Sequence, residues 1–126
     1  LIEATRKVLF VGIEAVKIGN TVGDIGYAIE CFIKPYGYGI IRDLAGHGVG
    51  YKVHEDPYVP NFGNKGEGEK LQIGMVIAIE PMLNEGTREI ILDNDGYTYR
   101  TADGKKSAHF EHTVALTKNG VKILSI

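Results

Sequence analysis

The chain has 126 residues, of which 44% are hydrophobic and 24% charged, and its formal net charge at pH 7 is −2. This length suits one domain with a modest core. A nearly balanced charge with scattered basic residues argues against a nucleic-acid partner or an anionic membrane surface. No apolar run has the length of a membrane span. We therefore expect a globular protein without a nucleic-acid or membrane partner.

The single cysteine, Cys31, excludes an internal disulfide within the chain. It lies in an apolar helical pattern, which predicts a buried structural thiol rather than a catalytic one. This cysteine usage fits a reducing compartment, and we expect the cytoplasm. The chain starts at Leu1 in a helical pattern and without an initiator Met, which favours further sequence upstream.

Two helices are predicted in the first third of the chain. Residues 1–17 place apolar side chains on one stripe at helical spacing, and Gly19 supplies a stop. Thr21 and Asp24 have the spacing of a capping box at the start of a second helix. Pro35 either ends this helix or lies in its last turn. The short connection between the two helices predicts that they pack as neighbours.

From Tyr38 onward the pattern changes to short apolar or alternating runs, separated by turns rich in Gly, Asn and Asp. Lys-Asn-Gly at 118–120 predicts a hairpin. We expect an α+β fold in which the two helices cover one face of a mainly antiparallel, curved sheet. The predicted strands are YGII (38–41), YKVH (51–54), MVIAIEPM (75–82), REIILD (88–93), YTYR (97–100), HTVALT (112–117) and VKILSI (121–126).

Three ionisable side chains fall where a buried strand is expected: His47, Glu80 and Glu111. Burying even a neutral polar group without a partner costs about 2–7 kcal/mol, so a carboxylate there must be paired, protonated or bound to metal. Arg88 and Arg100 are candidate partners, but both lie in polar segments. One imidazole and two carboxylates provide most of a coordination shell for Mn, Fe, Co or Zn. The alternative for each glutamate is exposure at a strand end or a salt bridge.

The other histidines receive different interpretations. His54 follows His47 by seven residues, near the end of a predicted short strand. Alone it would be structural, but beside a metal site its imidazole would hold a substrate carbonyl or oxyanion. His112 faces away from its neighbour Glu111 in a regular strand, which predicts a core or outer-shell position. No role is assigned to His109.

Glycines at 46, 48 and 50 surround His47. Glycine removes side chains at positions that backbone or substrate approach closely. We therefore predict that backbone and substrate approach this segment closely around a metal-binding imidazole. A tight turn that contains a histidine is the alternative.

Three blocks of sequence, in this order, resemble type I methionine aminopeptidases. They are GHGVGYKVHEDPYVPNFG (46–63), LQIGMVIAIEPML (71–83) and DGYTYRTADGKKSAHFEHTVALTKNGVKIL (95–124). The resemblance covers essentially all of residues 1–126, but only the C-terminal half of that enzyme. It implies half of an α/β pita-bread fold, with the N-terminal half absent. Prolidases and aminopeptidase P share the fold and the histidine and glutamate positions, so an Xaa-Pro peptidase is the alternative.

The resemblance implies a site with two divalent metal ions (Co, Mn, Fe or Zn) and five protein ligands. His47, Glu80 and Glu111 match three of these ligands. It further implies that Glu111 bridges the ions and that Glu80 also handles the proton of the attacking water. The other two ligands would be aspartates from the N-terminal half, and no segment here resembles their motifs.

The resemblance also implies substrate contacts. His54 matches the histidine that contacts the scissile amide, whereas Tyr97 and Val53 fall where the family walls its methionine pocket. The expected reaction is removal of the N-terminal methionine from peptides and nascent proteins, with the isolated chain inactive. The missing half, or a second copy of the chain, would complete the fold. A non-catalytic interaction module that keeps this half-fold is the remaining alternative.

Overall fold

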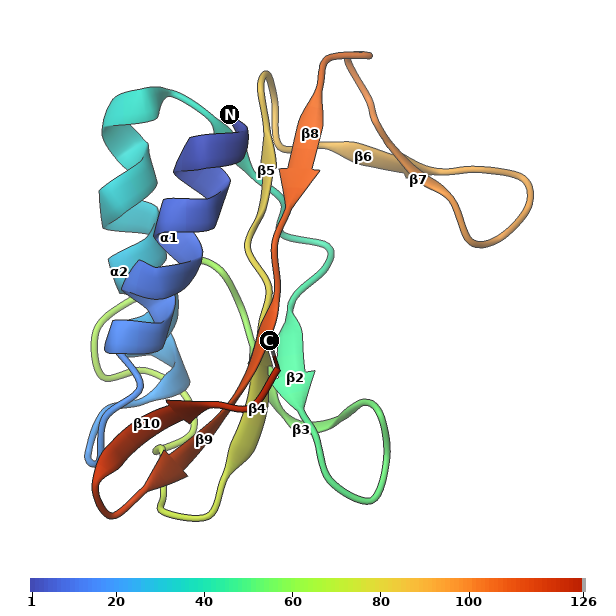
Figure 1. Ribbon diagram of the computed structural model, residues 1–126. Helices are drawn as coiled ribbons and strands as arrows, with labels where there is room; N and C mark the ends of the chain where they lie inside the picture. The colour runs from blue at the N-terminus through green and yellow to red at the C-terminus, as the bar shows by residue number, and fades with distance from the viewer. Residues whose placement is uncertain (126) are drawn as a thin grey trace.

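The computed structural model describes residues 1–125 and places two helices side by side on one face of the sheets (Figure 1). Among these residues, neither α-helix has the length and apolar character that crossing a bilayer requires. The helical elements are α1 (Ile2–Glu14), α2 (Val22–Ile33) and the 3-10 turn η1 (Lys34–Tyr36). The strands are β1 (Gly39–Ile40), β2 (Gly46–Gly48), β3 (Glu55–Val59), β4 (Val76–Ile79), β5 (Met82–Asn84), β6 (Ile90–Leu92), β7 (Tyr99–Thr101), β8 (Ser107–His109), β9 (His112–Thr117) and β10 (Gly120–Ile123).

The start of α2 forms as its sequence predicts. The backbone N–H of Thr21 donates to Oδ2 of Asp24 at 2.8 Å, and the N–H of Asp24 donates back to the Thr21 hydroxyl at 3.4 Å. These reciprocal bonds satisfy backbone donors that the first turn of a helix leaves free. The helix ends at Ile33, and Pro35 lies in the following 3-10 turn. The capping box and the helix end are therefore confirmed.

The strands form two main sheets and one separate hairpin, and every pairing within them is antiparallel. The larger sheet has the order β10-β9-β4-β2-β3, and the smaller has the order β1-β5-β8. The predicted hairpin at 118–120 is confirmed as the turn between β9 and β10. The pair β6-β7 projects from the rest of the chain (Figure 1).

The core lies between the helices and the larger sheet. Ile25 and Ile29 of α2 are fully buried, as are Ile79 of β4 and Val114 of β9. Removing such side chains from water contributes about 1.5–3 kcal/mol each. Helix packing therefore fixes the strands that carry the candidate site.

Three predictions about local structure are wrong. The single strand expected at 75–82 is divided into β4 and β5, which lie in different sheets. Residues 51–54 form bends rather than a strand, because the N–H of Lys52 donates to Oε2 of Glu55 and closes a turn ahead of β3. Cys31 is exposed rather than buried. It lies on α2 about opposite the face that Ile29 and Ile33 present to the core, because two residues along a helix correspond to roughly 200°.

Candidate metal centre

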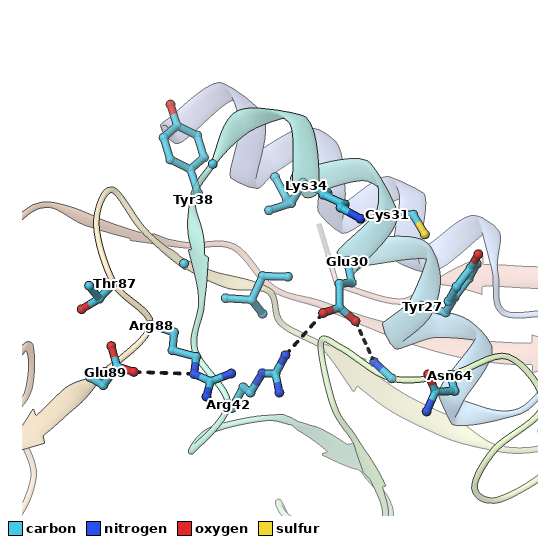
Figure 2. Close-up of a pocket in the computed structure, with 15 residues that line it drawn as sticks. Tyr27, Glu30, Cys31, Lys34, Tyr38, Arg42, Asn64, Thr87, Arg88 and Glu89 are labelled. Carbon is cyan, nitrogen blue, oxygen red and sulfur yellow. Dashed lines mark hydrogen bonds and ion pairs between the residues drawn. The ribbon is translucent and has the colours of Figure 1, made fainter.

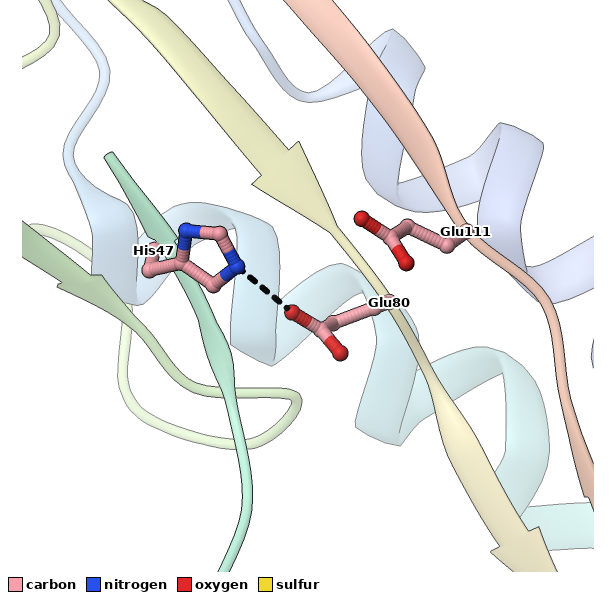
Figure 3. A group of neighbouring side chains, drawn as sticks. All are labelled: His47, Glu80 and Glu111. Carbon is pink, nitrogen blue, oxygen red and sulfur yellow. Dashed lines mark ion pairs between the residues drawn. The ribbon is translucent and has the colours of Figure 1, made fainter. Parts of the chain in front are cut away.

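One strand and two irregular segments bring together the side chains that the sequence analysis singles out. His47 is the central residue of β2, Glu80 follows β4, and Glu111 lies between β8 and β9. One nitrogen of His47 and one carboxylate oxygen from each glutamate all lie within 4.8 Å of one another. Figure 3 shows the three side chains converging from three neighbouring segments of the chain. Residues far apart in the sequence therefore form one group.

The two glutamates lie close together because strand pairing is interrupted at the same level in two neighbouring runs, β4 to β5 and β8 to β9. Ile79 at the end of β4 pairs with His112 of β9, and Met82 of β5 pairs with His109 of β8. Between these pairings, each run crosses from the larger sheet to the smaller one. The irregular residues at the crossing include one glutamate from each run, so the sheet registers place them beside each other.

The hydrogen bonds of His47 set which ring nitrogen faces the glutamates. Its Nδ1 lies 2.9 Å from the carbonyl oxygen of Gly48, which only a ring N–H can satisfy. In the neutral ring Nε2 then keeps its lone pair, and it lies 3.3 Å from Oε1 of Glu80. A histidine held in this way through its other nitrogen is the usual arrangement of a metal ligand.

Burial of the group is uneven. The side chains of His47 and Glu80 are 15% and 12% exposed, which agrees with the buried positions expected for them. Glu111 is exposed, so the expectation of a buried strand position is wrong for this residue. β8 ends at His109 and β9 begins at His112, which leaves Glu111 in the irregular connection between the two sheets.

The glycines next to His47 allow close backbone packing. A Cβ at Gly46 would overlap the carbonyl oxygen of Ala78 in β4, and one at Gly48 would overlap the carbonyl oxygen of Asp56 in β3. β2 is therefore confined between its two neighbours by backbone atoms alone. The predicted close approach of backbone is confirmed at Gly46 and Gly48.

His54 lies in the bend ahead of β3, and its exposed ring approaches that of His47 with centroids 4.1 Å apart. Together with Lys52, Asp56 and Tyr58, the two rings line an open hollow of about 390 Å³. The structure thus brings His54 to the edge of the metal group.

The two predicted pocket residues lie in different places. Val53 adjoins His54 and is 74% exposed. Tyr97 is 88% exposed and lies in the turn between β6 and β7, at the end of the projecting hairpin (Figure 1). Within residues 1–125 these side chains do not form a closed pocket, and their contact with methionine stays a prediction.

Sequence reasoning missed two contacts to Glu80. Nε2 of His109 lies 3.3 Å from Oε2 of Glu80, and the side-chain amide of Asn61 donates to the Glu80 carbonyl oxygen at 3.1 Å. The contact of His109 follows from the pairing of residues 107–109 with residues 82–84. This pairing sets His109 opposite Met82, two residues after Glu80. The short run Ser-Ala-His has no strand-like apolar pattern, so this pairing was not predicted.

The remaining candidates lie outside the group. His112 packs against Phe10 with ring centroids 5.8 Å apart, and its Nδ1 lies 3.0 Å from Oγ of Ser125, which confirms that it faces away from Glu111. Asp24 is engaged as the cap of α2. Among the described residues, the three ligand candidates have no fourth His, Cys, Asp or Glu within the same mutual distance.

A second hollow, of about 810 Å³, lies between α2 and the loop before β6 (Figure 2). Four of its charged side chains form two pairs. Glu30 accepts from Arg42 at 3.4 Å, and Arg88 lies 3.6 Å from Glu89. None of the three ligand candidates lines it, so we place the functional site at the His47 group.

Known proteins share this sequence and fold. A methionine aminopeptidase of Clostridium perfringens is 49% identical over 126 residues, covering 100% of this chain and 51% of that protein. The crystal structure of methionine aminopeptidase from Rickettsia prowazekii superimposes with a TM-score of 0.97 at 42% identity, covering 100% of this chain and 51% of that one. The prolidase of Pyrococcus horikoshii is more distant, with a TM-score of 0.72 at 29% identity and coverage of 98% and 30%.

The chain spans about half the length of the curated relatives it matches. The family model described as metallopeptidase family M24 matches residues 1–118. The pita-bread architecture expected from the sequence agrees with the solved structures that superimpose on it. On this match, together with the convergent histidine and glutamates, the chain belongs to metallopeptidase family M24.

Proposed function

We propose that this chain is the C-terminal half of a methionine aminopeptidase, which removes the N-terminal methionine from peptides and nascent proteins. The observation that carries the proposal is the convergence of His47, Glu80 and Glu111, whose ligand atoms lie within 4.8 Å of one another. The higher identity to methionine aminopeptidases than to prolidases, 49% against 29%, favours methionine over an Xaa-Pro substrate.

The donor set suits a divalent cation. One neutral imidazole and two carboxylates match the preferences of Mn, Fe, Co and Zn. When bound here, such an ion acts as a Lewis acid and makes a coordinated water more acidic. We propose that His47, Glu80 and Glu111 would be three of the protein ligands that hold two such ions. Three protein ligands leave both ions incompletely held, so the proposal requires further ligands from outside the chain.

We assign the missing ligands to two aspartates of an N-terminal half. Asp24 caps a helix, and no other acidic side chain of the described chain joins the group. A second copy of this chain is the alternative source, because it too could cover the exposed side of Glu111. The proposed partners are therefore this missing half and a peptide N-terminus. We also propose the cytoplasm as the compartment, in keeping with one cysteine and no internal disulfide.

The chain's own residues would each perform one task. Glu80 accepts a proton from the attacking water and returns it to the leaving amine. His54 donates to the substrate carbonyl oxygen as charge develops there. Its ring already lies 4.1 Å from that of His47, so a carbonyl group held by His54 would lie next to the metal group.

The proposal is tested by supplying the missing half. The chain is fused behind the N-terminal half of the Clostridium perfringens enzyme and assayed on Met-Ala and Xaa-Pro peptides. We expect hydrolysis of Met-Ala peptides by the fusion and none by the chain alone. Glu80→Gln should abolish turnover while sparing the fold, and Glu14→Gln, at an exposed helix end, is the matched control. Near-normal turnover of Glu80→Gln would refute its assigned role, and preference for Xaa-Pro peptides would favour the prolidase alternative.

Metal titration separates the catalytic proposal from a non-catalytic interaction module. A module has no use for a half-buried carboxylate facing an imidazole, because such groups are costly without a partner. We expect the fusion to bind Mn or Co more tightly than the chain alone in isothermal titration. Equal and negligible binding by both would favour the module.

A further inference from the structure

Each carboxylate oxygen of Glu80 faces an imidazole nitrogen. Oε1 lies 3.3 Å from Nε2 of His47, and Oε2 lies 3.3 Å from Nε2 of His109. The carbonyl oxygen of Glu80 also accepts the amide N–H of Asn61, which is 1% exposed. Backbone and side chain of this glutamate are therefore each held by a separate contact. We infer that His109 is a positioning residue, which fixes the Glu80 carboxylate by a hydrogen bond to Oε2.

The sheet register fixes His109 at this place. It ends β8, and its partner across the ladder is Met82, at the start of β5. Glu80 lies two residues before that partner, in the crossing between the sheets. The contact is thus set by backbone pairing on both sides, and it does not depend on a flexible loop.

His109 is placed to orient the carboxylate rather than to bind the metal. The mutually close group of ligand atoms contains His47, Glu80 and Glu111, and among the described residues His109 is not a member. Its side chain is 45% exposed, against 12% for Glu80. His109 contacts Oε2 of Glu80, whereas His47 lies next to Oε1. Outer contacts of this kind restrict rotation of a ligating carboxylate, and their loss typically costs 10–100-fold in affinity or activity.

This inference rests on the proposed function, because the roles given to Glu80 require Oε1 to face the metal group. With Oε2 held, the carboxylate keeps that orientation before any ion or substrate arrives. Without His109, Oε2 would lose this contact, and rotation of the carboxylate about its last bond would be less restricted. Because the ring is half-exposed, we expect an effect near the lower end of the usual range, about tenfold in kcat with little change in KM.

Two substitutions at position 109 separate the effect of the N–H donor from the effect of the ring's volume. His109→Phe keeps a ring of similar size but removes the donor. His109→Gln keeps an N–H donor on a side chain of similar reach. Thermal unfolding of both variants checks that the strand β8 remains folded. A purely structural role would predict that Phe is the better substitute, whereas positioning predicts that Gln is.

The first measurement needs neither metal nor activity. The carboxyl carbon-13 resonance of Glu80, identified by its loss in Glu80→Gln, is recorded in the metal-free chain. We expect His109→Phe to shift this resonance and His109→Gln to return it toward its original position. An unchanged resonance in His109→Phe would overturn the inference.

The second measurement uses the fusion with an N-terminal half. We expect kcat to fall about tenfold in His109→Phe and to recover in His109→Gln. Equal loss in both variants would overturn the inference. If the unmodified fusion hydrolyses no peptide, the proposed function fails, while the carboxyl resonance still decides whether His109 holds Glu80.

Discussion

Gly46→Ala tests whether backbone crowding sets the position of His47. The added Cβ would overlap the carbonyl oxygen of Ala78 in β4, and it would also lie 3.2 Å from the carbonyl oxygen of Val59 in β3. Both obstacles are backbone atoms of paired strands, so neither can turn aside as a side chain does. Overpacking costs about 1–3 kcal/mol, and we expect the upper end, near 3 kcal/mol.

The comparison variant is Gly37→Ala, at the end of η1. Gly37 has φ +70° and no atom within 4 Å of an added Cβ, so its cost is that of a left-handed backbone, about 1 kcal/mol. At roughly 4 °C per kcal/mol for a domain of this size, the two variants should lower Tm by about 12 °C and 4 °C. Chemical denaturation supplies the corresponding free energies of unfolding.

A metal titration of the same two variants, each made in the fusion with an N-terminal half, relates the stability of β2 to metal binding at the site. Gly46→Ala should weaken Mn or Co binding, because His47 is the next residue and must move with the displaced strand. Gly37→Ala should leave binding unchanged, since it lies outside the His47 group. If Gly46→Ala destabilises the protein no more than Gly37→Ala, the account of β2 as a strand confined by backbone is wrong.

Two further predictions concern the helices. Asp24→Ala should cost about 1 kcal/mol at neutral pH, because it removes half of the capping box. The Thr21 backbone N–H holds the pKa of the Asp24 carboxyl below its ordinary value of 3.8. The stabilisation is therefore present above pH 3.8 and is lost as pH falls through the lower pKa of the folded state. If urea denaturation shows that Asp24→Ala lowers the free energy of unfolding equally in acid and at neutral pH, the assignment is contradicted. Cys31 should react with an aromatic disulfide reagent in the folded protein, because its side chain is exposed; reaction only after denaturant is added would show that it is buried.

The features predicted best from the sequence are those that depend on residues close together along the chain. The capping box of Thr21 and Asp24 and the turn between β9 and β10 each depend on a few consecutive residues, and both are confirmed. The strands β3 and β8 were missed, since one contains Pro57 and the other is only three residues long. Pairing with distant segments, rather than a local apolar pattern, makes these two segments strands.

The same division applies to the candidate site. His47 and Glu80 were identified because an ionisable group in an apolar or glycine-rich run is conspicuous without any structure. His109 was left without a role, since its contact with Glu80 follows from the register of β8 against β5. Exposure of Glu111 was not foreseen either, because the strand expected to bury it is interrupted at that residue.

That interruption has a chemical cause in the partner run. Pro81 has no N–H to donate to a ladder, so β4 cannot continue through it. Its carbonyl oxygen still accepts the N–H of Phe110, which holds the two broken runs together at the crossing. A continuous strand would alternate its side chains between a buried and an open face, with its backbone fully paired. By breaking both runs at one level, the fold places Glu80 and Glu111 side by side, next to an imidazole on the third strand. The proline after Glu80 thus contributes to the site through the backbone, although its side chain is no part of the ligand group.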